Sequence, residues 1–440
     1  MKISVIGTGY LGAVHAVCMA HIGHEVVGYD TNVSTIEALA SGTPPFYEPG
    51  FEELLKATLE TGRLRFTDTP EVAVGDAVLH FICVGTPQSS GSEAADMSYV
   101  DSAVRMVADS VTCDGLIVGK STVPVGTASR LSREFLQGSA SAGIEIAWNP
   151  EFLREGRAIE DTLNPDRLVF GVTSQYAEKL LLDVYSKVIS EGTPYVVTDL
   201  PTAEMVKVAA NSFLATKISF INAMAEICEI AGADVVTLSD ALGYDDRIGR
   251  KFLNAGLGFG GGCLPKDIRA FGARAGELGA SDALSFLREV DKINMRRRDK
   301  AVSVAATLLG GSFLGKNVAV LGAAFKPESD DVRDSPALNV AAAMHLKGAS
   351  VRVHDPKAIS NAKARFPTLT YCTTLADACD RADLVVLATE WAEYRSIDPT
   401  TFKQVVREPR LLDTRNALEH EYWAEAGWQV CALGRGGFNA

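Results

Sequence analysis

Gly7-Thr8-Gly9-Tyr10-Leu11-Gly12 matches the pattern G-x-G-x-x-G and decides the fold of the N-terminal part of this chain. The apolar run Lys2 to Ile6 comes directly before it, and the helical pattern Ala13 to Ile22 follows it. The glycines permit a tight turn and let backbone amides approach a pyrophosphate at a helix N-terminus. Asp30 ends the next apolar run, where a carboxylate can bind ribose hydroxyls. The sequence therefore predicts a Rossmann-like domain, and NAD rather than NADP, because the carboxylate would repel a 2′-phosphate.

Short apolar runs alternate with amphipathic stretches through the first 200 residues. Continuous Val- and Ile-rich runs separated by helical patterns predict a parallel sheet covered on both faces. The pattern restarts at Asn317 and predicts a second α/β domain. The apolar runs are Lys2 to Ile6, Glu25 to Tyr29, Ala77 to Val84, Leu116 to Gly119, Ile144 to Trp148 and Arg167 to Gly171, then Asn317 to Leu321, Ser350 to Val353, Ala382 to Ala388 and Arg410 to Leu412.

Between these two parts, Pro201 to Ala231 contains no glycine and is rich in Ala, Met, Ile, Lys and Glu, which predicts one long helix. The expected fold class is α/β, with two Rossmann-like, doubly wound parallel-sheet domains joined by this helix and a helical middle domain. The expected domains are 1–200, which binds NAD, 201–311, which is helical and forms a dimer surface, and 312–440, a second Rossmann-like domain that binds a nucleotide or nucleotide sugar.

Composition excludes several functional classes. The net charge of −13 repels nucleic acid and anionic membrane, so an anionic ligand needs local cations and backbone amides. The longest apolar runs stay under the ~18 residues of a membrane span, and the N-terminus lacks a signal-peptide pattern. The eight cysteines are scattered without CxxC pairs and do not cluster with histidines. We expect a cytoplasmic protein with reduced thiols and no metal site.

The densest motif is the loop from Gly256 to Asp267. Five glycines among the seven residues 256–262 expose backbone amides, and Cys263 follows them, where Lys266 and the amides could stabilise a thiolate. The other seven cysteines are interpreted as packed thiols. In the long helix, Glu204, Lys207 and Asn211 share one face. A lysine and an asparagine there could donate to an oxyanion, although a solvated polar stripe is the alternative interpretation.

The C-terminal domain carries only Gly322-Ala323-Ala324-Phe325-Lys326-Pro327 after its first apolar run. This loop lacks the later glycines of a dinucleotide loop. It better suits the nucleotide end of a ligand, with Lys326 near a phosphate, although such a lysine alone is more often a solvated charge.

Ordered motifs along the whole chain resemble the UDP-glucose/GDP-mannose dehydrogenase family. The segment Asp246 to Leu253, before the cysteine loop, resembles the UDP-glucose 6-dehydrogenase branch most. The matching stretches are Gly7 to Gly12, Gly85 to Pro87, Ser121 to Pro124, Asn149 to Gly156, the Glu204/Lys207/Asn211 helix, Gly260 to Asp267, Phe325 to Pro327 and Asp331 to Pro336.

The resemblance implies a four-electron oxidation of a nucleotide hexose at C6, UDP-glucose to UDP-glucuronate, through a thiohemiacetal and a thioester on Cys263. Glu151 and Asp267 would manage protons and water, Lys207 and Asn211 would stabilise oxyanions, and Thr122 would position the reacting centre. The implied cofactor contacts are Gly7, Gly9, Leu11, Gly12, Asp30, Thr86, Thr122, Glu155, Lys266 and Arg333. The implied substrate contacts are Glu151, Phe152, Leu153, Arg154, Glu155, Lys207, Asn211, Arg247, Phe252, Leu253, Asn254, Ala255, Gly256, Gly260, Lys326 and Arg415.

The resemblance also implies a homodimer, in which Arg247 reaches the neighbouring subunit's site. Three positions depart from the family pattern: Thr35 stands where many relatives have lysine, Gly262 where serine is common, and Leu264 where phenylalanine is common. The alternatives are a dehydrogenase for GDP-mannose or dTDP-glucose, a redox-inactive nucleotide-sugar-binding protein, and a two-electron hydroxyacid dehydrogenase. The last would need neither the cysteine loop nor a second nucleotide domain.

Overall fold

The computed structural model describes residues 1–136 and 143–436. The chain forms two compact units, Met1–Ala210 with Ala273–Gly279, and Asn211–Gly272 with Ala280–Ala440. The long helix α10 (Leu200–Ala231) contributes residues to both units. The predicted helix over 201–231 is thus observed one residue longer at its start. Residues 137–142 and 437–440, which the predicted domain ranges include, lie outside the described residues.

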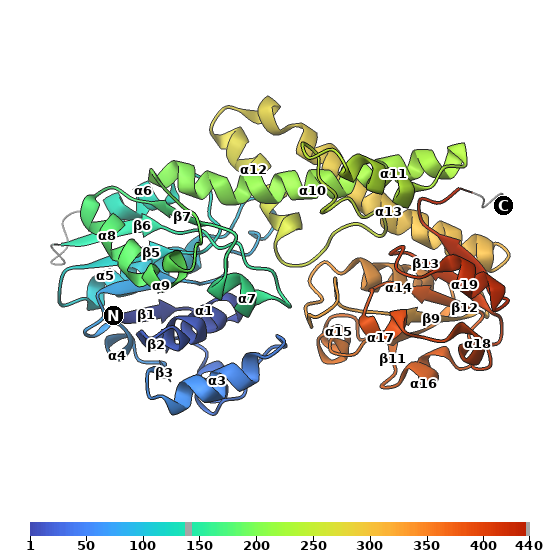
Figure 1. The fold of residues 1–440 in the computed structure, drawn as a ribbon, viewed down its shortest axis with the longest axis horizontal. Coiled ribbons are helices and arrows are strands. Elements are labelled where there is room, and N and C mark those ends of the chain that lie inside the picture. The colour runs from blue at the N-terminus through green and yellow to red at the C-terminus, as the bar shows by residue number, and fades with distance from the viewer. Residues whose placement is uncertain (137–142, 437–440) are drawn as a thin grey trace. The chain divides into compact units, whose positions relative to one another are not determined.

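The first unit is built on an eight-stranded sheet in the order β3-β2-β1-β4-β5-β6-β7-β8 (Figure 1). Neighbouring strands are parallel except β6 and β7, which pair antiparallel through Trp148 and Gly171. This single antiparallel pair is a departure from the fully parallel sheet that the sequence predicts. The strands are β1 (Lys2–Ile6), β2 (Glu25–Tyr29), β3 (Leu64–Thr67), β4 (Leu79–Ile82), β5 (Gly115–Gly119), β6 (Ile144–Trp148), β7 (Leu168–Gly171) and β8 (Tyr195–Thr198).

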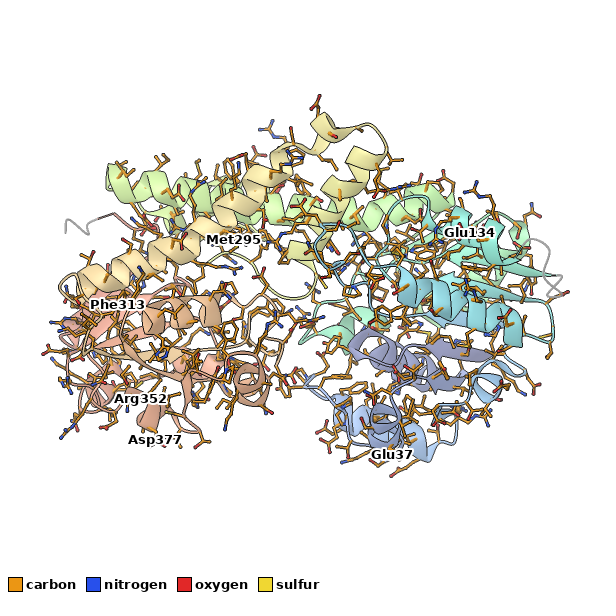
Figure 2. The ribbon with its side chains drawn as sticks, turned by 180° about the vertical axis from the view of Figure 1, so that it is seen from behind. Glu37, Glu134, Met295, Phe313, Arg352 and Asp377 are labelled. Atoms are coloured by element: carbon orange, nitrogen blue, oxygen red, sulfur yellow. The ribbon has the colours of Figure 1, made fainter. Side chains whose placement is uncertain are left out.

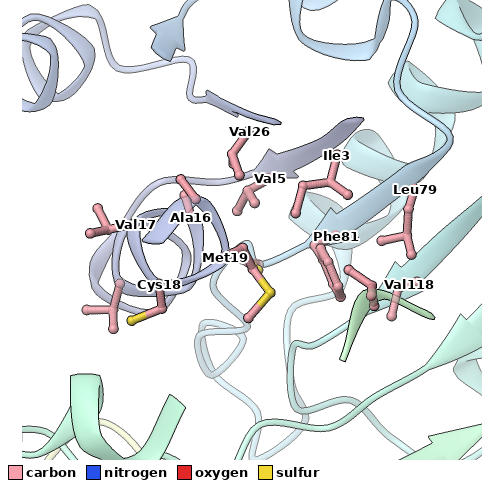
Figure 3. Packing of buried hydrophobic residues seen from close by; sticks show 14 of the residues in the cluster. Ile3, Val5, Ala16, Val17, Cys18, Met19, Val26, Leu79, Phe81 and Val118 are labelled. Carbon is pink, nitrogen blue, oxygen red and sulfur yellow. The ribbon is translucent and has the colours of Figure 1, made fainter. Parts of the chain in front are cut away.

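Helices cover both faces of this sheet, because its central strands are apolar on both sides. All residues of β4 and β5 are buried, the pattern of strands packed between two helical layers. Val5, Phe81 and Val118 of the sheet pack with Ala16 of α1 in one such layer (Figure 3). The helices are α1 (Tyr10–His21), α2 (Val33–Ala40), α3 (Phe51–Glu60), α4 (Pro70–Val74), α5 (Ser98–Ser110), α6 (Thr127–Leu131), the π-helix η1 (Ser132–Leu136), α7 (Ala158–Leu163), α8 (Gln175–Val184) and α9 (Ser186–Ser190).

The second unit contains a six-stranded, all-parallel sheet in the order β11-β10-β9-β12-β13-β14. Its strands are β9 (Asn317–Leu321), β10 (Ser350–His354), β11 (Thr370–Tyr371), β12 (Leu384–Leu387), β13 (Arg410–Asp413) and β14 (Gln429–Ala432). The helices around it are α14 (Pro336–Leu346), α15 (Ile359–Arg365), α16 (Leu375–Cys379), α17 (Ala392–Arg395), α18 (Pro399–Phe402) and α19 (His420–Glu425).

Four further helical segments follow α10 along the chain: α11 (Val235–Gly243), α12 (Leu264–Glu277), the 3-10 helix η2 (Ser281–Leu284) and α13 (Phe286–Leu308). Charged side chains such as Glu37, Glu134 and Asp377 lie exposed on the surfaces of the two units (Figure 2). Within the described ranges, no helix is both long and apolar enough to cross a membrane.

Candidate active site

The glycine loop after β1 fits the pyrophosphate of a dinucleotide. A Cβ atom at Gly12 would lie 1.8 Å from the Gly7 carbonyl oxygen, so α1 packs against the turn as closely as its backbone allows. At Gly9, in contrast, an added Cβ would meet no atom within 4 Å, so this side of the loop is open to a ligand. Gly9 is also the N-cap of α1, and no side chain caps the helix there. The amides at the start of α1 can therefore bind an anion.

Asp30 is held beside this loop. Its carboxylate accepts hydrogen bonds from the backbone N–H groups of Thr8 (2.8 Å) and Asn32 (3.0 Å). These contacts fix the carboxylate at the end of β2, where an adenosine ribose would bind. The residues present thus fit NAD, in agreement with the prediction from the motif.

The corresponding carboxylate in the second unit, Asp355 after β10, is used differently. It accepts hydrogen bonds from the amides of Ala323 (2.7 Å) and Ala324 (3.0 Å), from the Trp391 indole (3.2 Å) and from the amides of Lys357 and Ala358. Asp355 is also only 2% exposed. A buried carboxylate with five donors has no capacity left for ribose hydroxyls, which supports the prediction that this loop is a poor dinucleotide site.

Glu151, a predicted catalytic residue, follows β6 in the first unit. One carboxylate oxygen accepts from the amides of Phe152 (2.6 Å) and Leu153 (2.5 Å), and the other lies 3.3 Å from the Lys120 ammonium. Lys120 is 4% exposed and also donates to the Tyr185 hydroxyl. Burial alone would lower the pKa of Lys120, but Tyr185 and Glu151 raise it above its ordinary value. Glu151 is therefore fixed in one orientation beside a permanent cation.

Sequence reasoning missed Lys120. The sequence signal that could have identified this lysine is its position, directly after the buried strand β5 and before the matched stretch Ser121 to Pro124. A cavity of about 30 Å³ lies beside the Lys120 and Glu151 pair. His15 lines it too, and burial lowers the pKa of this histidine well below its ordinary value, so the ring is neutral. The interior next to Glu151 is consequently polar.

The polar face of α10 is buried, so the alternative interpretation as a solvated stripe is wrong. Glu204, Lys207 and Asn211 are 2%, 9% and 6% exposed. Glu204 accepts from the amides of Gly126 (2.6 Å) and Ala128 (2.7 Å) and so caps α6, which gives it a structural role. The Lys207 ammonium lies 5.4 Å from the centre of the Phe152 ring.

The second unit brings Cys263, Asn211, Lys266 and Asp267 together at the start of α12. The Asp267 amide donates to the Cys263 carbonyl (3.0 Å), so the exposed cysteine stands at the helix N-terminus. The Asp267 carboxylate is 1% exposed and accepts from the Lys266 ammonium (2.5 Å) and the Asn211 side-chain amide (2.6 Å). A helix N-terminus with a nearby lysine stabilises a thiolate, so this arrangement suits a nucleophile.

The predicted catalytic residues thus form two groups. Thr122, Glu151 and Lys207 belong to the first unit, and Cys263, Asn211 and Asp267 to the second. In the first unit, the Thr86 hydroxyl donates to the Thr122 carbonyl (2.9 Å), which links a predicted cofactor contact to a predicted catalytic residue.

The predicted substrate segment Phe252 to Gly256 is partly buried. The side chains of Leu253 and Ala255 lie in a core cluster with Ile221 and Ala225, so contacts from these two residues would have to come from the backbone. Phe252 adopts a left-handed φ of 67°. The segment is therefore held by its own packing.

Several predicted arginine contacts have protein partners. Arg415 donates to the carbonyls of Ala388 (2.7 Å), Gly258 (3.1 Å) and Phe325 (3.4 Å), which makes it a brace between loops. Arg154 is paired with Asp161. The Arg247 side chain is 90% exposed, and its guanidinium forms an ion pair with the Asp245 carboxylate at 2.6 Å. A Cβ at Gly262 would lie 2.2 Å from the Arg333 guanidinium carbon, which is the end of a flexible side chain that can move aside, so this contact does not explain the glycine.

Two Rossmann-like sheets, an open glycine loop and a cysteine at a helix N-terminus are the features of a nucleotide-dependent dehydrogenase. Residues 1–189, 201–296 and 319–420 match the models described as the NAD binding, central and UDP binding domains of the UDP-glucose/GDP-mannose dehydrogenase family. The chain belongs to this family, and its cofactor is NAD. Family membership, the α/β fold and NAD, all predicted from the sequence, are thereby confirmed.

Proteins that match this chain over nearly their whole length support its membership of this family. The chain is 41% identical over 436 residues to the UDP-glucose 6-dehydrogenase of Rickettsia typhi, with 99% of both chains covered. It is 40% identical over 437 residues to that of Rhizobium meliloti, with 99% of this chain and all of the relative covered. The solved structure of a UDP-glucose dehydrogenase from the hyperthermophilic archaeon Pyrobaculum islandicum superimposes with a TM-score of 0.90 at 39% identity, and 99% and 98% of the two chains are covered.

Proposed function

We propose that this protein oxidises the C6 hydroxyl of UDP-glucose to the carboxylate of UDP-glucuronate, with NAD as the oxidant in both steps. The observation that carries this proposal is identity of about 40% to UDP-glucose 6-dehydrogenases over nearly the full length of both chains. The position of Cys263 at the start of α12, beside Asn211 and Asp267, supports it.

Cys263 supplies what the second oxidation requires. Bound NAD accepts a hydride from C6 in each oxidation. The first oxidation yields an aldehyde, which has no hydride to give until a nucleophile adds to it. The Cys263 thiolate adds to the aldehyde carbon and forms a thiohemiacetal, from which the second hydride leaves to give a thioester. Water then attacks the thioester carbon, and the carbon–sulfur bond breaks to release the acid and restore the thiol.

The surrounding residues handle charge and protons. Lys207 and Asn211 each donate to the C6 oxygen as it gains negative charge, and Asn211 is oriented by its hydrogen bond to Asp267. Thr122 positions the reacting centre. Glu151 and Asp267 accept the protons released from the alcohol and from the attacking water. The balance is one alcohol, one water and two NAD converted to one carboxylate, two NADH and three protons.

The remaining predicted contacts bind the two ligands. We assign Gly7, Gly9, Leu11, Gly12, Asp30, Thr86, Glu155, Lys266 and Arg333 to the cofactor. We assign Phe152, Leu153, Arg154, Glu155, Phe252, Leu253, Asn254, Ala255, Gly256, Gly260 and Lys326 to the nucleotide sugar. Leu253 and Ala255 would contribute through their backbone groups, and Arg415 holds the loops around the ligand.

A panel assay tests the proposal against its alternatives. NADH formation is measured with UDP-glucose, GDP-mannose, dTDP-glucose and a simple hydroxyacid, and the NADH formed per molecule consumed is counted. We expect two NADH per UDP-glucose and a kcat/KM for UDP-glucose at least about tenfold above the others, which corresponds to about 1.4 kcal/mol. A larger kcat/KM with another nucleotide sugar would reassign the substrate, and no NADH with any of them would favour a redox-inactive binding protein.

Asp30 is expected to set the cofactor preference. Asp30→Ala should reduce the preference for NAD over NADP about tenfold or more, because it removes a charged partner of the ribose hydroxyls that also repels a 2′-phosphate. Asp30→Asn is the matched control for loop structure, since it keeps an acceptor for the Thr8 amide. The ratio of kcat/KM values for the two cofactors is the measurement. A wild-type enzyme that used both cofactors equally would contradict this assignment.

We further propose that the active form is a homodimer with sites completed across subunits. Phe213, Phe220 and Ile227 of α10 are 66%, 48% and 59% exposed and recur every seven residues, so they form an apolar stripe along one side of the helix. Such a repeat is typical of helix pairing. Arg247, with its exposed side chain, would reach the site of the neighbouring subunit.

Mixed dimers test the shared site. Arg247→Ala and Cys263→Ala homodimers should each be nearly inactive, whereas a heterodimer of the two has one site with both residues intact. About half of the wild-type activity per heterodimer is expected, from one intact site in two. Activity of purified heterodimers no higher than that of the two parents would argue against a site shared between subunits.

We also propose that the protein acts in the cytoplasm and that each of its three domains has its own role. All eight cysteines are free thiols, and the proposed chemistry requires Cys263 to stay reduced, which suits the cytoplasm. We assign NAD binding to residues 1–200, dimerisation to 201–311 and binding of the nucleotide sugar to 312–440.

A further inference from the structure

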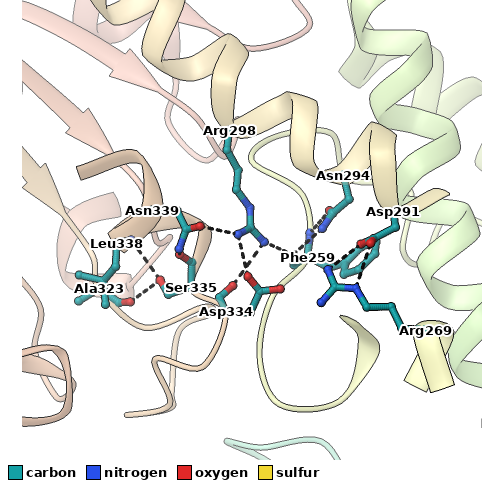
Figure 4. Close-up of polar contacts among 10 residues, drawn as sticks. All are labelled: Phe259, Arg269, Asp291, Asn294, Arg298, Ala323, Asp334, Ser335, Leu338 and Asn339. Atoms are coloured by element: carbon teal, nitrogen blue, oxygen red, sulfur yellow. Dashed lines mark hydrogen bonds and ion pairs between the residues drawn. The ribbon is translucent and has the colours of Figure 1, made fainter. Parts of the chain in front are cut away.

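The loop that leads to Cys263 is held by side chains of α13. The Asn294 side chain accepts from the Phe259 amide (2.7 Å) and donates to the Phe259 carbonyl (3.0 Å), so it uses both backbone groups of one loop residue (Figure 4). Asn294 is fully buried. The middle of the loop is thus fixed to a rigid helix by two hydrogen bonds that water cannot reach.

Arg298, one turn further along α13, extends this contact to a second segment. Its guanidinium donates to the Phe259 carbonyl (3.3 Å), to a carboxylate oxygen of Asp334 (2.8 Å), to the Asp334 carbonyl (3.4 Å) and to the Asn339 side chain (2.9 Å). Arg298 is 4% exposed, so these four acceptors surround a buried cation (Figure 4). A planar guanidinium can serve several acceptors at fixed angles, which a lysine ammonium cannot do.

The two segments that Arg298 joins are also in direct contact. The Gly261 amide donates to the Arg333 carbonyl (2.8 Å), and a Cβ at Gly260 would lie 2.4 Å from the Asp334 carbonyl oxygen. Asp334 adopts a left-handed φ of 44°, a conformation that costs energy in a residue other than glycine and persists only where neighbours enforce it. Arg298 bonds both the side chain and the carbonyl of Asp334, and so provides that constraint.

We propose that Arg298 is a positioning residue for the covalent step: it holds the loop that ends in Cys263 against the Arg333–Asp334 segment, so that the thiol meets the aldehyde carbon. The inference rests on the proposed role of Cys263 as nucleophile. The first hydride transfer does not use the thiol. Displacement of the loop therefore slows the second oxidation more than the first, since an error of about 1 Å in the placement of a reacting group can reduce a rate about 10²-fold.

The partition between aldehyde and acid measures this role. The protein is incubated with UDP-glucose, NAD and a hydrazine reagent that traps free aldehyde, and trapped aldehyde is compared with the NADH formed. Arg298→Lys keeps the charge and loses the fork, and is expected to raise the trapped fraction at least about tenfold, with a smaller fall in the rate of the first hydride transfer. A general loss of folded protein lowers both rates equally and leaves this fraction unchanged.

Arg296→Lys is the matched control, because Arg296 lies on the same helix but pairs with Glu226 of α10. Its trapped fraction should equal that of the wild type. If Arg298→Lys does not fold, Asn339→Ala, which removes one acceptor of the guanidinium outside the loop, is measured instead and should raise the fraction in the same direction.

Cys263→Ala in the same assay separates the two ideas. If this variant stops at the aldehyde while Arg298→Lys, or Asn339→Ala in its place, keeps the wild-type fraction, the positioning role is overturned and the covalent mechanism stands. If Cys263→Ala still forms acid at the wild-type rate, the proposed function of Cys263 fails, and the inference about Arg298 fails with it.

Discussion

Cys263→Ala is expected to lower the rate of uronic acid formation at least about 10³-fold, because the adduct from which the second hydride leaves would then have to come from water, a much poorer nucleophile than a thiolate. Binding of UDP-glucose and NAD should survive, since the proposed contacts lie elsewhere. The measurement is the acid formed per enzyme over time, together with the NADH formed per sugar. Acid production near the wild-type rate, with two NADH per sugar, would show that Cys263 is not the nucleophile.

Cys263→Ser sharpens this test. The hydroxyl is a poorer nucleophile than the thiolate, and an ester is hydrolysed more slowly than a thioester. A sugar adduct should therefore accumulate on Cys263→Ser and add the mass of the substrate acyl group in intact mass spectrometry. Cys263→Ala, which has no nucleophile at this position, is the control and should show no adduct.

Lys207→Met is expected to lower kcat about 10²- to 10³-fold, the usual effect of removing one donor to an oxyanion. The replacement is close in length, so the buried site on α10 should retain its packing. KM for UDP-glucose should change less than kcat, because the ammonium is proposed to act when negative charge develops on the C6 oxygen. The two constants are obtained from initial rates of NADH formation.

Glu204→Gln, one turn earlier on α10, is the control for damage to the helix. Glu204 caps α6 through two backbone amides, so its loss of charge should lower the free energy of unfolding by about 1 kcal/mol. Its kcat should stay within about threefold of the wild type, a change below 1 kcal/mol. An equal loss of kcat in both variants would contradict a direct role for Lys207.

The sequence predicts the central strands of both sheets and misses the outer ones. The four strands without a predicted apolar run, β3, β8, β11 and β14, are the four strands at the ends of the two sheets. An end strand has only one neighbour and is covered less, so it does not require a continuous apolar run. Residues of β8 are exposed or half-buried, and β11 has only two residues. How deeply each strand is buried depends on its place in the sheet, and the sequence alone does not give that place.

The site, too, can be predicted only in part. Motif spacing identified the residues with expected chemical roles, Cys263 and Lys207 among them, but not the buried side chains that hold them. Lys120, Asn294 and Arg298 stand in ordinary strand and helix patterns, and only the folded chain brings them to Glu151 and Phe259. Glu204 shows the converse. It shares a helix face with Lys207, yet folding turns its carboxylate toward α6.

The two carboxylates at the ends of β2 and β10 limit how this protein could be redesigned. A second dinucleotide site cannot be installed in the C-terminal domain by adding glycines to the loop 322–327, because Asp355 is already enclosed by five donors while Asp30 remains partly accessible. In the C-terminal domain this carboxylate holds the loop and the chain after β10 together, so cofactor binding there would require rebuilding the core behind the loop.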